Sequence, residues 1–80
     1  MTLTDRARLA EQIITDLGDP PMVGVTFRDH EIAIQTHMPL DGIDYKTQTS
    51  GAGTYYAHKY MDGDEQVRLC AYVHAEEVTA

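Results

Sequence analysis

Histidine and cysteine are the side chains of this sequence best suited to metal binding or proton transfer. The histidines are His30, His37, His58 and His74, and Cys70 is the single cysteine. No His-x-His or His-x-x-x-His spacing occurs, and strand geometry would separate Cys70 from His74 by about 13 Å. We therefore expect no metal site and no cofactor, and we interpret His58 as a core histidine with a polar partner.

A thiol nucleophile is the second chemistry to consider, with Cys70 activated by His58 or His74. No acid or amide stands at a spacing that would orient either imidazole. A single cysteine on an alternating strand is more simply a half-buried packing residue. The sequence therefore predicts a protein that is not an enzyme.

Two pairs of carboxylates and one glycine-rich loop complete the candidates for chemistry. Asp41 with Asp44, and Asp62 with Asp64, stand in turn-rich segments, where aspartate is favoured for local hydrogen bonding. The loop at residues 50–53, Ser-Gly-Ala-Gly, precedes a predicted strand, whereas a phosphate-binding loop must lead into a helix. These features favour turns over acid–base catalysis or nucleotide binding.

Composition and charge limit the classes of partner. The chain has 80 residues, an apolar share of 42% and a formal net charge of -7, from 13 acidic and 6 basic side chains. These values are typical of one small globular domain, here 1–80. The excess negative charge argues against direct nucleic-acid binding and against an anionic membrane surface. One cysteine and the lack of a long apolar run lead us to expect a cytoplasmic protein.

The N-terminal segment predicts an amphipathic helix over about 4–17. Its apolar residues recur at spacings of three and four, at Leu9, Ala10, Ile13, Ile14 and Leu17. Thr4 is the expected N-cap, and Gly18 followed by Asp-Pro-Pro cannot continue the helix. The apolar stripe needs a surface to cover, which the following strands supply.

Two hairpins follow, at about 22–37 and 54–74. In the first, the alternation consists of Val23, Val25 and Phe27, and it resumes after the turn as Ile32, Ile34 and Thr36. A two-residue turn at Asp29-His30 would pair apolar residues across the hairpin and place Arg28 opposite Glu31. In the second, a turn near Asp62-Gly63 precedes a core-facing alternation at Val67, Leu69, Ala71 and Val73.

Residues 39–53 form a turn-rich connector in which a short strand is possible, and 75–80 form a polar tail. The resulting fold class is α+β, with the N-terminal helix packed on an antiparallel sheet of four or five strands. The sheet face opposite the helix would meet solvent or a partner.

Tyrosines and acidic loop tips are the candidate partner-binding residues. Tyr55 and Tyr72 fall on the outward face of the second hairpin, and tyrosine is enriched in binding surfaces. Clustered loop tips would make a negative rim that suits a basic groove. The acidic side chains expected to engage the partner are Asp41, Asp44, Asp62, Asp64 and Glu65.

The stretch 51–63, Gly-Ala-Gly-Thr-Tyr-Tyr-Ala-His-Lys-Tyr-Met-Asp-Gly, together with the size and charge, resembles small acidic phage-encoded inhibitors, namely the anti-CRISPR proteins and the DNA-mimicking glycosylase inhibitors. The resemblance implies a stoichiometric, non-enzymatic inhibitor that acts in the host cytoplasm without a cofactor.

Two other functions stay open. Small size and free strand edges favour a homo-oligomeric accessory or virion protein, for instance a homodimer. A small enzyme or ligand-binding fold would instead be built in a dimer cleft around His58, Cys70 and His74.

Overall fold

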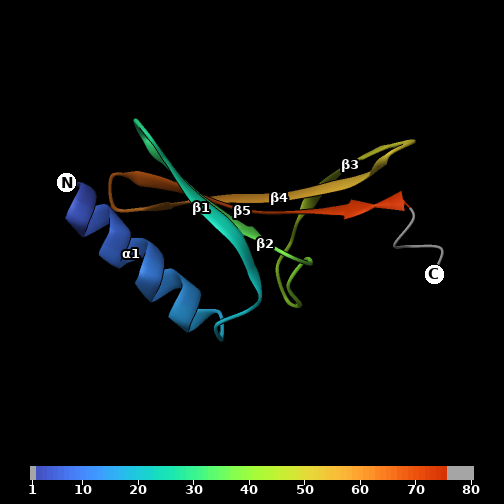
Figure 1. The fold of residues 1–80 in the computed structure, drawn as a ribbon. Coiled ribbons are helices and arrows are strands. Elements are labelled where there is room, and N and C mark those ends of the chain that lie inside the picture. The colour runs from blue at the N-terminus through green and yellow to red at the C-terminus, as the bar shows by residue number, and fades with distance from the viewer. Residues whose placement is uncertain (1, 76–80) are drawn as a thin grey trace.

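The computed structural model describes residues 2–75 as one helix and a five-stranded sheet (Figure 1). The elements are α1 (Leu3–Asp16), β1 (Met22–Arg28), β2 (Glu31–Thr36), β3 (Lys46–Ser50), β4 (Gly53–Asp62) and β5 (Glu65–His74). The predicted α+β class with a helix on a sheet is confirmed. Of the predicted tail, all but Ala75 lies outside the described residues. Within residues 2–75, no helix is long and apolar enough to cross a membrane.

The sheet joins the two hairpins side by side in the order β1-β2-β5-β4-β3. The strands within each hairpin are antiparallel, and β3 is antiparallel to β4, but the central pair β2 and β5 runs parallel from Glu31↔Gln66 to Gln35↔Cys70. These two strands are also the most buried, which is typical of parallel pairs. The parallel joint directs the turns of both hairpins toward the same end of the sheet.

Helix α1 begins at Leu3, and its N-cap lies two residues earlier than the sequence predicted. The N-cap is Thr2, whose hydroxyl accepts a hydrogen bond from the Asp5 amide at 3.1 Å, while the Asp5 carboxylate accepts one from the Thr2 amide at 3.3 Å. Thr4, the predicted cap, lies inside the helix. The physical reason is the side chain three residues after each candidate cap. Asp5 can complete a capping box with Thr2, whereas Ala7 cannot complete one with Thr4.

The first hairpin has the predicted turn, with Arg28 opposite Glu31. Its other end contains a register shift between Met22 and Gly24, which displaces Val23 from the predicted alternation. Val23 is consequently 59% exposed, and Met22 packs against the core in its place. A bulge of this kind moves each residue beyond it to the opposite face of the sheet from the one that the alternation predicts.

The predicted connector 39–53 contains a strand and a tight turn. Residues 46–50 form β3, which makes a hairpin with β4 around residues 51–52. The remaining segment crosses the sheet on the same side as α1, and its Ile43 and Tyr45 pack against the core. The turn of the second hairpin consists of Gly63 and Asp64, because Asp62 pairs with Glu65.

The core lies between α1 and one face of the sheet. Its buried residues are Ala10, Ile13, Ile32, Ile34, Val67 and Leu69. The helix lies across the half of the sheet that includes both hairpin turns, and the connector crosses farther along (Figure 1). The opposite face of the sheet is not covered by any described element, and we call it the open face.

Candidate functional site: an acidic hairpin end and an open sheet face

The two hairpin turns lie together at one end of the molecule, which we call the hairpin end and define by Asp29, Asp62 and Asp64 (Figure 1). The parallel register continues into the turns, where the His30 carbonyl accepts a hydrogen bond from the Gln66 amide at 3.2 Å. All three aspartates are exposed. Two loops that are more than thirty residues apart in the chain are thereby brought together as one negatively charged surface.

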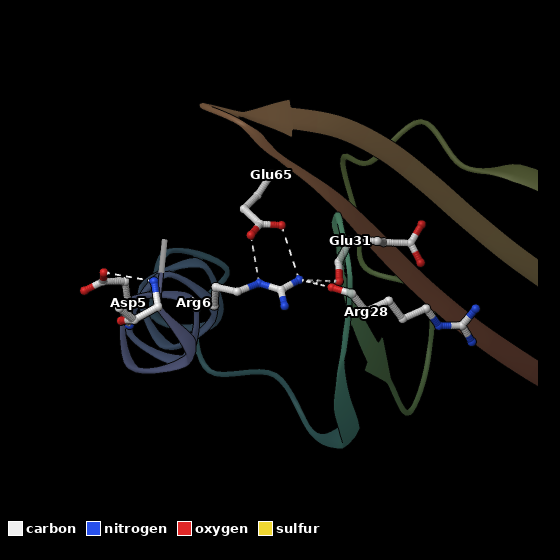
Figure 2. A network of polar contacts seen from close by, with 6 residues as sticks. Asp5, Arg6, Arg28, Glu31 and Glu65 are labelled. Carbon is white, nitrogen blue, oxygen red and sulfur yellow. Dashed lines mark hydrogen bonds and ion pairs between the residues drawn. The ribbon is translucent and has the colours of Figure 1, made fainter.

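Arg6 of α1 fixes the helix to this end of the sheet (Figure 2). Its Nε lies 2.8 Å from Oε1 of Glu65, and its Nη2 donates to Oε2 of Glu65 at 3.3 Å. The same Nη2 donates to the Glu31 carbonyl at 2.9 Å and to the Arg28 carbonyl. One guanidinium therefore connects α1 to both hairpins, and the Phe27 ring lies 5.6 Å from it.

Glu65 does not belong to the exposed acidic surface. It is 7% exposed, and its carboxylate is engaged by Arg6. The predicted contact residues Asp41 and Asp44 are exposed but lie on the connector, away from the hairpin end. The Asp44 carbonyl is 3.1 Å from Nδ1 of His58 in the middle of β4, so His58 has the polar partner that the sequence predicted. The loop tips thus form two separate acidic regions.

Tyr55 and Tyr72 are directly opposite each other on the open face. They are half-buried, and the Tyr72 ring also makes an edge contact with the His74 ring at a centroid distance of 4.8 Å. Asp62 lies seven positions after Tyr55 on β4, a distance of about 23 Å along an extended strand. The tyrosine pair and the acidic hairpin end are therefore distinct surfaces.

The strand register places four of the six basic side chains on the open face. Among the described strand residues, Glu31 is the one acidic side chain on this face. The four are Arg28, Lys46, Lys59 and Arg68. Arg68 pairs with Glu31 at 2.9 Å, and Glu31 also accepts a hydrogen bond from Gln66 at 2.8 Å. The protein therefore separates its charges, since the excess acid lies on the loops and helix whereas this sheet face is basic.

Burial raises the pKa of the Tyr55 phenol, and the neighbouring Cys70 raises it further. Burial likewise raises the pKa of Tyr60.

A raised folded-state pKa means that the unfolded chain loses these protons first, so the stability that they contribute is complete below pH ~10 and is lost above it. We expect thermal stability to fall in this alkaline range, and to fall less in a Tyr55→Phe variant; an identical decline in both proteins would contradict the shift.

The structure also describes the residues that the sequence offered for metal binding and for a thiol nucleophile. Within residues 2–75, no group of three or more His, Cys, Asp or Glu side chains is placed to hold a metal ion. The Cys70 thiol is buried against the Ile34 carbonyl, with the sulfur 3.7 Å from the oxygen. Comparisons with protein families, with curated proteins and with solved structures give no match.

Sequence reasoning missed Arg6 and Lys46 as residues that shape these surfaces. Arg6 and Glu65 are 59 positions apart, and nothing local in the sequence indicates that they meet. Lys46 joins the basic face because β3 pairs with β4, which places it opposite Ala57. The available signal was the short strand that the sequence allowed within residues 39–53, which the structure places at Lys46–Ser50.

Proposed function

We propose that the protein is a non-enzymatic binding module for another protein. In its most specific form it is a stoichiometric inhibitor whose acidic hairpin end occupies a basic groove of a host nucleic-acid-binding complex, as in the phage-encoded inhibitors that the sequence resembles. It needs no cofactor and acts in the host cytoplasm.

The parallel pairing of β2 with β5 is the observation that carries the proposal, because it brings three exposed aspartates to one end. Arg6, the nearest helix cation, is bound to Glu65 and does not neutralise them. None of these three carboxylates forms an ion pair within residues 2–75, so the two tight turns present a negative edge that is complementary to a groove lined by lysine and arginine.

Two charge reversals of equal size test the location of the contact. Asp62→Lys with Asp64→Lys changes the hairpin end, and Asp41→Lys with Asp44→Lys changes the connector by the same total charge. We expect the first pair to weaken binding to a captured partner at least about tenfold, because each reversal turns an attraction into a repulsion. The connector pair should bind almost as the unchanged protein does.

The measurement is affinity capture from a nuclease-treated host lysate, followed by mass spectrometry and titration of the captured protein. A basic nucleic-acid-binding protein, held at fixed stoichiometry and displaced by nucleic acid, is the expected partner. Equal loss in both variants would show that only net charge matters, and equal retention would remove the hairpin end as the contact. Capture of this chain alone would favour a homo-oligomer instead.

A further inference from the structure

A hollow of about 310 Å³ lies on the open face beside the middle of β4, and its nearest lining residue on that strand, Lys59, is about 10 Å along the strand from Asp62. Ala57 is part of its lining, and the side chains around this small residue are much longer, namely Lys46, Tyr55, Lys59 and Arg68. Ala57 pairs with Lys46 on one side and with Cys70 on the other, and Cys70 is buried. The depression therefore follows from short residues in the middle of a row of long ones.

The charges around the hollow are only partly balanced. Arg68 is paired with Glu31, and no ion pair is present for Lys46 or Lys59 among residues 2–75. Lys59 also stands directly opposite Arg68, and like charges in this position destabilise a sheet. A bound anion would relieve this repulsion, so the site is electrostatically complementary to a negatively charged group.

The shape of the site favours phosphate over carboxylate. Arg68 already uses part of its planar donor set on Glu31, which leaves two lysines as point charges that approach from different strands. Lysine ammonium groups are point charges with rotatable donors, and they suit the tetrahedral oxygens of a phosphate, which do not lie in one plane. The Tyr55 ring adds an aromatic wall on which a planar ring can stack.

The extent of the site favours one small ligand over a nucleic-acid strand. A volume of about 310 Å³ is at the lower end of the range of small-molecule sites, roughly 300–1,000 Å³. A strand that continued beyond it would approach a protein of net charge -7, whose carboxylates repel phosphates. Repulsion grows with each added phosphate, whereas one phosphate meets only the local cations.

We propose that the hollow lined by Lys46, Tyr55, Lys59 and Arg68 is a binding site for a mononucleotide-like ligand, with its phosphate between the lysines and its ring on Tyr55. The site lies on the open face and is independent of the hairpin end. Its failure and the failure of the proposed protein contact are therefore separable.

The test uses adenosine monophosphate as the probe and measures binding to the full chain by calorimetry and by the shift in melting temperature. Adenosine, which lacks the phosphate, tests the contribution of the phosphate to binding, and inorganic phosphate, which lacks the ring, tests the contribution of the ring. A single-stranded oligonucleotide tests whether the site prefers a nucleic-acid strand. We expect adenosine monophosphate to bind most tightly of the four, more weakly as salt increases, and to raise the melting temperature. Variants of Asp62 and Asp64 should leave this affinity within about twofold.

Matched variants locate the site. Lys46→Gln and Lys59→Gln should each weaken the binding of adenosine monophosphate about five- to tenfold, because each removes one charged hydrogen-bond donor. Arg28→Gln, which removes a cation from the same face but outside the hollow, should have less than a twofold effect. Equal binding of adenosine and its monophosphate, tighter binding of the oligonucleotide, an equal effect of all three variants, or no binding at all would overturn the proposal.

Discussion

Replacing Arg6 by methionine is expected to lower the free energy of unfolding by about 3–5 kcal/mol. The substitution leaves the Glu65 carboxylate without its cation in a site where the side chain is 9% exposed. It also removes the donor for the Arg28 and Glu31 carbonyls at the start of the sheet. A domain of this size has a total stability of about 5–15 kcal/mol, so the variant should lose a large fraction of it.

Arg8→Met is the matched control for this prediction. Arg8 is exposed on the same helix, so its replacement loses the same charge and should change stability by less than about 0.5 kcal/mol. Replacing Arg6 by methionine and Glu65 by leucine together should recover much of the loss, because neither charge is then buried alone. Urea titrations followed by circular dichroism measure all three; equal stability of the Arg6 and Arg8 variants would show that the ion pair is not structural.

Gly53→Ala is expected to destabilise the protein by about 2–4 kcal/mol through backbone overlap and strain. A Cβ atom at Gly53 would lie 2.3 Å from the Val73 carbonyl oxygen and 3.0 Å from both the His74 Cα and the Tyr72 Cζ. The residue has φ of +156°, and two of the three atoms belong to the paired backbone of β5, which cannot rotate away. The variant must separate the ends of β4 and β5 or displace the Tyr72 ring.

Gly51→Ala provides the comparison, because a Cβ at Gly51 meets no atom within 4 Å. It should melt within a few degrees of the unchanged protein, since a surface substitution costs less than about 0.5 kcal/mol. Thermal melts compare the two variants, and the aromatic circular dichroism of the Tyr55 and Tyr72 pair reports the local rearrangement. Equal melting temperatures and unchanged aromatic signals in both would mean that Gly53 is not a close-approach position.

The charge distribution has consequences beyond stability. A protein with net charge of -7 would ordinarily be excluded from binding phosphates, and the sequence was interpreted in that way. The sheet, however, collects basic side chains from β1, β3, β4 and β5 on one face. Net charge governs long-range attraction, whereas a single bound group responds to the charges within a Debye length of about 8–10 Å.

Local sequence patterns determined the elements and the pairing within each hairpin. The spacing of Leu9, Ala10 and Ile13 defined the helix face, and the Asp29-His30 turn fixed the first hairpin, since both depend on neighbours in the chain. The outward placement of Tyr55 and Tyr72 followed from the strand period of two. Local exceptions escaped this reasoning, because the cap at Thr2 and the bulge at Val23 depend on individual hydrogen bonds.

Only the tertiary structure decided how the hairpins meet. Alternation indicates that β2 and β5 are both apolar, but parallel and antiparallel pairings would bury the same side chains. The parallel choice united Asp29 with Asp64, and the β3–β4 pairing brought Lys46 beside Ala57. The hairpin end arises from a contact between distant segments, which a local pattern does not specify because strand order depends on the packing of the whole sheet. The β3–β4 hairpin is local, but the turn-rich sequence of the connector did not define its register.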